Sequence, residues 1–302
     1  MKKLPLFIIL LIALSSFVFY SCSTTNKATD SKMLHFNLEK GKGYDYEMVW
    51  DMETKVDGQL TVITVDGKYS MKIIEDDGET KSIETAYQSF KMNMDMMGMN
   101  ISMDSDKPLS PGDNQDLEKN PLGVLNKVIR GLIGKPFIVK INKEGDIVEV
   151  TGFEKIISDL VDSTGIKQEA KKQVMASVTD QFNEGTLKDN FAQIFTMFPN
   201  KEVKVGDTWE KTYKTGGKTA SQMVTKYTVK AIDGDHVTLD ANTDISEAST
   251  GSPLTGKQTG TIIVDSKTGL IVNATYDQTM EIKEEGSNIV IVAKGKIKGT
   301  AH

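Results

Sequence analysis

The chain has 302 residues, with 36 Lys and Arg against 42 Asp and Glu, a formal net charge of -6, and one cysteine. An acidic chain with a single arginine, Arg130, lacks the cationic surface that binds the phosphate backbone, so we expect no nucleic-acid partner. One cysteine excludes an intramolecular disulfide and cysteine-ligated zinc or iron–sulfur sites. Three scattered histidines leave little for a metal enzyme, so no cofactor is expected.

The only cysteine follows a hydrophobic N-terminal segment. Two lysines precede an apolar run that ends at Tyr20, and the sequence turns polar after Cys22. This order is typical of a secretory signal peptide, so we predict a lipoprotein signal peptide over 1–21, cleavage before Cys22 and acylation of Cys22. The alternative is an uncleaved membrane anchor, because an apolar run of about 17 residues is at the lower limit for a spanning helix.

The residues around Cys22 also predict a location. The next residue is Ser23 rather than the aspartate that retains enterobacterial lipoproteins in the inner membrane, and no acidic cluster follows that would direct the protein to the cell surface. We therefore expect a lipid-anchored envelope protein, on the outer membrane and facing the periplasm. Residues 22–32 are rich in Ser, Thr, Asn and Lys, which predicts a flexible tether.

From residue 33 onward, apolar and polar side chains alternate over short runs. In KGYDYEMVWDMETKV, Tyr44, Tyr46, Met48 and Trp50 share one face of an extended strand. Glycine-containing pairs and triplets between the runs predict turns at 57–58, 66–67, 76–78, 144–145, 233–234, 268–269 and 285–286. Residues 33–302 are therefore predicted to form a mainly β fold of the α+β kind, with a large curved antiparallel sheet or half-barrel.

Amphipathic helices are predicted in the middle of the chain. Their apolar residues recur at helical spacing over 121–134, 153–161, 166–182 and 187–198. Pro121 suits the first position of the first helix, and Thr151 with Glu154 predicts a capping box at the start of the second. The apolar stripes must pack against another surface, most simply one face of the sheet.

The two ends of the chain show a similar order of motifs. In each, a glycine and an aromatic residue are followed by a tyrosine-led strand, an acidic-glycine turn and a returning strand. We interpret them as two related halves, about 33–152 and 200–300, joined by helices over 153–198. A true duplication would superpose residues 36–152 on residues 203–284 in strand order; the alternative is that hairpins of any antiparallel protein produce such echoes.

Several stretches carry a family resemblance. They are GYDYEM, NPLGVLNKVIRGLIGKPF, FPNKEVKVGDTWEK and TGTIIVDSKTGLIVNATY, together with the lipidation signal. In these features the chain resembles the uncharacterised domain-of-unknown-function lipoproteins of Bacteroidota. It is more distantly similar to lipoprotein carriers and lipid-binding lipoproteins, in which helices plug the concave face of a curved antiparallel sheet. That similarity implies a lipid or lipoprotein ligand.

A methionine cluster stands out in KMNMDMMGMNISMDSD. Met92, Met94 and Met96 share one strand face, and Met99 opens the next strand. Thioethers at this density suit three interpretations: a packed core, an adaptable groove for a lipid or partner, or a Cu(I) site at Met94, Met96 and Met99. For the groove, Phe191 and Phe195 are the facing helix residues, which would act as a lid.

The sequence contains no G-x-S-x-G elbow, phosphate-binding loop or H-E-x-x-H motif. A hydrolase built on two carboxylates stays as a minor alternative, because such residues need only converge in space. The main prediction is a non-enzymatic binding or carrier module for a hydrophobic ligand. The alternative is a structural or protein-interaction lipoprotein with a solid core. The sequence predicts no oligomeric state.

Overall fold

The computed structural model describes residues 31–96, 98–109, 121–168, 171–172, 184–214, 221–247, 254–284 and 287–302. The predicted signal peptide, Cys22 and all but the end of the predicted tether lie outside these residues, as does most of the predicted helix at 166–182. Residues 31–302 form one compact unit that contains every described helix and strand.

The structure is dominated by a single antiparallel sheet of twelve strands, which confirms the predicted fold class. Its order is β7-β6-β4-β3-β2-β14-β13-β12-β11-β10-β9, and β5 pairs with the far end of β4. The strands are β2 (Gly43–Val56), β3 (Gln59–Asp76), β4 (Thr80–Met96), β5 (Met99–Asp104), β6 (Phe137–Asn142), β7 (Ile147–Thr151), β9 (Thr208–Lys214), β10 (Ser221–Asp233), β11 (His236–Glu247), β12 (Leu254–Asp265), β13 (Leu270–Glu284) and β14 (Ser287–Ala301).

The first and the last long strands of the chain, β2 and β14, are neighbours in the middle of this sheet. Backbone hydrogen bonds from Gly43 N to His302 O (3.0 Å) and from His302 N to Gly43 O (2.8 Å) extend their pairing. From this pair, strands follow in chain order toward the edge strand β7 and in reverse order toward the edge strand β9. The two edges are therefore joined by the middle of the chain, residues 152–207.

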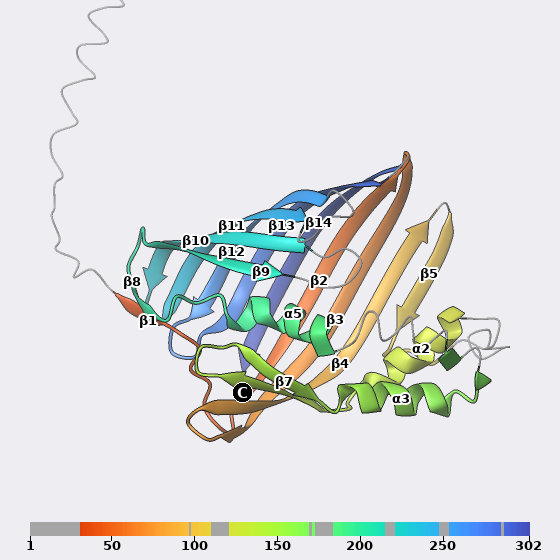
Figure 1. Cartoon of the computed structure of the whole chain (residues 1–302), viewed down its shortest axis with the longest axis horizontal. Coiled ribbons are helices and arrows are strands. Elements are labelled where there is room, and N and C mark those ends of the chain that lie inside the picture. Colours follow the sequence, from red (N-terminus) through yellow and green to blue (C-terminus); the bar gives the residue numbers. More distant parts are fainter. Residues whose placement is uncertain are drawn as a thin grey trace, which may run out of the picture. The chain divides into compact units, whose positions relative to one another are not determined.

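This connection crosses one face of the sheet (Figure 1). Helix α5 (Glu184–Phe195) contacts both edge strands, β7 and β9. Between α5 and β9, the short strand β8 (Lys201–Val203) pairs with β1 (Lys32–Leu34) in a separate two-stranded ladder. The two predicted halves thus occupy the two sides of one sheet, and their relation by duplication stays a prediction.

The two faces of the sheet differ in chemistry. Directly paired residues on neighbouring antiparallel strands point to the same face. On the face that α5 covers, here called the inner face, one row of paired residues runs Trp209, Tyr227, Ala241, Gly260, Tyr276, Gly295, Trp50 and Val65. The outer face carries ion pairs such as Lys68–Glu47 (2.8 Å) and Lys230–Asp240 (3.0 Å). The row of paired residues on the inner face is uncharged, whereas the outer face carries ion pairs.

The described helices bury one apolar stripe each, as predicted. Helix α2 (Pro121–Leu132) begins at the predicted proline and contacts β4 and α3 (Phe153–Ser163). The buried residues of the three helices are Val124, Val128 and Leu132 in α2, Phe153, Ile157 and Val161 in α3, and Leu187, Phe191 and Phe195 in α5. All of them join the main hydrophobic core on the inner face.

The predicted capping box at the start of α3 is wrong. Thr151 is the last residue of β7, so its backbone belongs to a strand. The N-cap is Gly152, which adopts the left-handed φ of 88° and makes no side-chain cap hydrogen bond. A glycine suits this position because the strand must turn sharply into the helix, which requires a φ that other residues rarely adopt.

The predicted turn at 66–67 is also wrong, because Asp66 and Gly67 lie inside the long strand β3. They pair with Val49 and Met48 on one side and with Lys91 and Phe90 on the other. Local turn propensity is overridden here by pairing on both sides of the strand. Gly67 instead lies one residue before a register shift between β3 and β4 at Lys68 and Tyr69.

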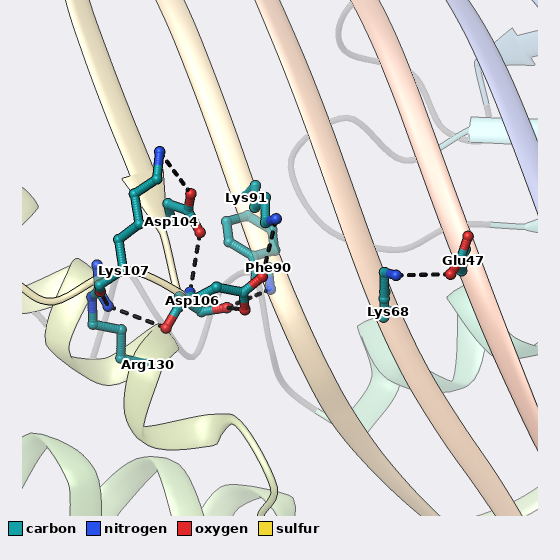
Figure 2. Close-up of polar contacts among 9 residues, drawn as sticks. Glu47, Lys68, Phe90, Lys91, Asp104, Asp106, Lys107 and Arg130 are labelled. Carbon is teal, nitrogen blue, oxygen red and sulfur yellow. Dashed lines mark hydrogen bonds and ion pairs between the residues drawn. The ribbon is translucent and has the colours of Figure 1, made fainter.

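The single arginine of the chain fastens α2 to the end of β5 (Figure 2). The Arg130 side chain donates from Nη1 to the carbonyl oxygens of Ser105 (3.2 Å) and Lys107, and from Nε to Asn126 Oδ1 (2.9 Å). Figure 2 also shows Lys91 paired with Asp106 (3.0 Å) beside this contact. The planar guanidinium supplies several fixed donors at once, which a lysine would not.

Two inner-face glycines on either side of β2 provide a matched stability test. A Cβ at Gly295 would lie 2.7 Å from the Trp50 ring, whereas a Cβ at Gly67 meets no atom within 4 Å. We expect Gly295→Ala to lower the free energy of unfolding by about 1–3 kcal/mol through overpacking. Gly67→Ala should leave it unchanged or raise it by about 0.4–1 kcal/mol. Urea unfolding of residues 31–302 measures both, and equal effects of the two variants would contradict the tight Trp50–Gly295 contact.

Candidate functional site

A cavity of about 320 Å³ lies between α5 and the inner face of the sheet. It reaches from β4 on one side to β9 on the other, so it extends across the sheet beneath the helix. The residues that line it are Met48, Trp50, Tyr69, Thr85, Tyr87, Leu187, Phe191, Gln193, Ile194, Met197, Tyr213, Met223, Thr225, Tyr227, Ala241, Thr243, Gln258, Ile262, Ile271, Tyr276 and Ile297. None of these carries a charge at neutral pH.

Aromatic rings that lie close to the backbone of neighbouring strands form much of the floor of this cavity. Trp50 and Tyr276 stack with centroids 6.1 Å apart, and the positions between and beside them are glycines, Gly295 and Gly260. A Cβ at Gly260 would lie 2.6 Å from the Tyr276 ring. Because the glycines have no side chains, the two rings can lie directly against the backbone of the sheet. The space between the rings and α5 therefore stays open.

Helix α5 forms the roof of the cavity. It presents Leu187, Phe191 and Ile194 to the cavity. Phe195 at its end packs edge-on against Phe36, with centroids 4.8 Å apart. Just beyond the helix, the Trp209 indole N–H donates to the carbonyl oxygen of Met197 at 2.8 Å. The C-terminal end of α5 is thus fixed both to the chain near β1 and to the edge strand β9.

Some hydroxyl groups of the cavity have protein partners, and others have none within the described part of the chain. On the β9–β11 side they pair with one another: the Tyr213 and Tyr227 hydroxyls are 3.2 Å apart, and Thr225 Oγ1 and Thr243 Oγ1 are 2.8 Å apart. On the β3–β4 side, Tyr69 Oη and Thr85 Oγ1 are buried without a hydrogen-bond partner among the described residues.

Burial raises the pKa of every described tyrosine above the ordinary value of 10.0. For Tyr69 and Tyr227, neighbouring tyrosines raise the pKa further. The affected residues are Tyr44, Tyr46, Tyr69, Tyr87, Tyr213, Tyr227 and Tyr276. Five of them line the cavity, so it is bounded by neutral phenols that can donate hydrogen bonds.

The two phenylalanines singled out from the sequence lie together on α5. Phe191 lines the cavity, and Phe195, which is 1% exposed, stacks on it with centroids 6.0 Å apart. Sequence reasoning missed most of the other lining residues. The alternation of aromatic residues over 44–50 was a usable signal for Trp50, but nothing local in the sequence brings Tyr276 or Tyr227 beside it.

The four methionines singled out from the sequence lie on the β4–β5 hairpin and are not among the residues that line the cavity. Met92 pairs with Val65 and Met94 pairs with Ile63, which places both on the inner face. Met96 lies opposite Met99, which is 56% exposed. The Cu(I) site at Met94, Met96 and Met99 stays a prediction.

The described residues contain no group of three His, Cys, Asp or Glu side chains that could hold a metal ion. Within the same residues, no helix has the length and apolar character needed to span a membrane.

The raised tyrosine pKa values predict how stability depends on pH. The unfolded chain releases tyrosine protons near pH 10, while the folded protein retains them, so the free energy of unfolding should fall as pH rises above about 10. Tyr276→Phe should weaken this dependence. Alkaline titration followed by tyrosinate absorbance, with circular dichroism as the measure of folding, tests this. Ionisation of these tyrosines near pH 10 in a protein that stays folded would contradict their burial.

Comparison with solved structures finds weak likenesses only. A lipovitellin structure described for its lipid–protein interactions matches with a TM-score of 0.48 and 9% identity over 87% of this chain, which spans only 26% of the lipovitellin chain. The translocator domain of the autotransporter NalP from Neisseria meningitidis gives a TM-score of 0.38 and 7% identity, over 88% of this chain and 90% of that one. These values are too low to carry an argument about function.

Sequence comparison is more informative about relationship. No curated protein matches the sequence significantly. A model of a family of unknown function, DUF6263, matches residues 78–271, which is more than half of the chain and extends from the turn before β4 into β13. The matched segment includes α5 and most of the strands that line the cavity. The chain therefore belongs to the DUF6263 family.

Proposed function

We propose that this protein is a non-enzymatic binding or carrier protein for a hydrophobic ligand, which it holds in the cavity beneath α5. The observation that carries the proposal is the cavity itself, about 320 Å³ in volume and lined by uncharged, mostly apolar side chains. Ligand sites in proteins are typically concave and apolar, with a few polar groups that fix orientation.

A space of this size is unusual for a packed core. Protein interiors contain few voids larger than a water molecule. The cavity here, about 320 Å³, is far larger than the ~10–15 Å³ that holds one water molecule on the same kind of measure. The rings of Tyr276 and Trp50 lie flat over Gly260 and Gly295. Because the rings stay close to the sheet, they do not fill the space beneath α5. The arrangement therefore favours a binding site over a solid structural core.

The residues that line the cavity also favour binding over an enzymatic reaction. No carboxylate, imidazole or thiol is present among the described residues that line the cavity. General acid–base and nucleophilic catalysis mostly depend on such groups. Together with the absence of a catalytic motif in the sequence, this favours binding over catalysis.

The methionines of the β4–β5 hairpin extend the proposed site. Met92 belongs to the same inner-face row as Trp50, a residue of the cavity wall, with Val65 between them. Met94 continues the next row beyond Ile63 and Met52. Unbranched, polarizable methionine adapts to varied apolar shapes. We propose that a long acyl chain runs from the cavity along the methionines of the β4–β5 hairpin. Helix α5, which carries Phe191 and Phe195, covers the part of the chain that lies in the cavity.

We further propose that acylated Cys22 tethers the protein to the envelope, on the outer membrane and facing the periplasm. Residues 1–22 support the lipid anchor, because two lysines are followed by an apolar run and then by the small residue Ser21 before Cys22. A membrane-tethered carrier would keep its cavity within reach of lipid. Cells fed a labelled fatty acid should label the protein, and Cys22→Ala should abolish the label. Label retained in Cys22→Ala would contradict the anchor.

A second candidate, a protein-interaction role, has one observation in its favour. Val62 and Val292 are 40% and 41% exposed, and both pair with Glu53 on the outer face. Exposed apolar side chains that gather on one face mark contact surfaces in some proteins. This role needs no cavity, so the following test separates the two candidates.

The carrier proposal is tested by filling the cavity. Ala241 is 4% exposed and lines the cavity, so Ala241→Phe would place a ring in the ligand space. The next residue of β11, Asn242, is exposed on the opposite face and provides a matched control, Asn242→Phe. Residues 31–302 should bind the fluorescent apolar probe N-phenyl-1-naphthylamine, Ala241→Phe should bind it at least about tenfold more weakly, and Asn242→Phe should bind it normally.

Circular dichroism and thermal unfolding of each variant establish that it is folded. A folded Ala241→Phe protein that binds the probe as tightly as the wild type would contradict the proposal. The same holds for a wild-type protein that does not bind the probe.

A further inference from the structure

The two unpartnered hydroxyls of the cavity indicate the class of ligand. Tyr69 is 4% exposed and Thr85 is 1% exposed, and both line the cavity. Tyr69 pairs with Tyr87, two residues from Thr85 on the same face of β4, so the two hydroxyl-bearing side chains are diagonal neighbours. Neither Tyr69 Oη nor Thr85 Oγ1 has a hydrogen-bond partner among the described residues.

The contrast with the other side of the same cavity makes this pair informative. There, the same residue types bond to each other, as Tyr213 with Tyr227 and Thr225 with Thr243. A buried polar group that lacks a partner costs about 1–3 kcal/mol, so native proteins rarely leave one. These two hydroxyls belong to diagonally neighbouring residues in a ligand cavity and are free to donate to an acceptor that the ligand supplies.

The orientation of Tyr69 is fixed before any ligand arrives. Its ring stacks on Tyr46, with centroids 5.2 Å apart and an angle of 16° between the planes. A carbonyl oxygen has two lone pairs and can accept hydrogen bonds from both hydroxyls. The site therefore has the donors that suit an acyl carbonyl.

Charge excludes the common ionised head groups from this position. Among the described residues, no lysine, arginine or histidine lines the cavity, and burial keeps the Tyr69 phenol neutral by raising its pKa. Along the strand, the inner-face cation nearest to Thr85 is Lys81, four residues earlier on β4. Its ammonium group pairs with Asp76 (2.5 Å) and donates to the carbonyl oxygen of Leu38 (2.7 Å), and it is not part of the lining. A carboxylate or phosphate at Tyr69 would lose its hydration without gaining a counter-charge.

We propose that Tyr69 and Thr85 donate hydrogen bonds to the carbonyl oxygen of an uncharged acyl ester, whose chain occupies the apolar remainder of the cavity. The ligand class is thus a neutral acyl ester rather than a free fatty acid or a phospholipid held by its head group. This inference rests on the proposed binding function and specifies the chemistry of the same site.

The test compares two ligands of equal chain length, 1-monolauroylglycerol as the neutral ester and laurate as the carboxylate, by displacement of the apolar probe at pH 8. Residues 31–302 should bind the ester at least about tenfold more tightly than laurate. The nearly isosteric variants Tyr69→Phe and Thr85→Val should each weaken ester binding by roughly fivefold. Both variants should weaken binding of the probe, which has no carbonyl group, much less than they weaken binding of the ester.

Tyr44→Phe is the matched control, because it removes a buried phenol that is not part of the cavity lining. It should leave ester affinity unchanged. Because Tyr69→Phe removes an unpartnered buried hydroxyl, the melting temperature of the ligand-free protein should not fall, which separates loss of binding from loss of folding.

Equal affinities for laurate and the ester would overturn this inference, and so would unchanged ester affinity in the Tyr69→Phe/Thr85→Val double variant. In either case, a wild-type protein that binds the probe would still support the proposed binding function. Failure of the wild-type protein to bind the probe would overturn both.

Discussion

The pairing of the first and last long strands is the constraint on which the rest of the structure depends. Because β2 and β14 lie side by side in the middle of the sheet, the chain must reach the far edge after β7 by crossing a face. This crossing places α5 over the inner face and brings it into contact with both edge strands. The cavity lies between this helix and the sheet, so it follows from the topology.

Two local features determine what kind of space this is. Rings of Trp50 and Tyr276 take the place of side chains at Gly295 and Gly260, which keeps the floor close to the sheet. Charged side chains are absent from the described lining of the cavity, and ion pairs such as Lys294 and Asp277 (3.4 Å) lie on the outer face. The result is an uncharged cavity in which the buried hydroxyls of Tyr69 and Thr85 have no partner among the described residues. This chemistry suits a neutral lipid.

Periodicity in the sequence predicted the antiparallel sheet and the described helices, since alternation over 44–50 and the helical spacing of Phe191 and Phe195 are local properties. It failed where long-range pairing decides the outcome. Asp66-Gly67 has turn chemistry but lies within β3, because neighbours on both sides extend it. The neighbours of Phe191 in the cavity wall, such as Tyr69, come from distant strands, so sequence spacing alone could not identify the site.

A lipid in the space beneath α5 would be visible in crystals of residues 31–302 grown with an acyl ester that carries bromine on its chain, because bromine is located by anomalous scattering. We expect a bromine peak between Phe191 and Trp50, with the ester carbonyl beside Tyr69. A cavity that stays free of ligand at saturating ester, or bromine found only on the outer face, would contradict this expectation.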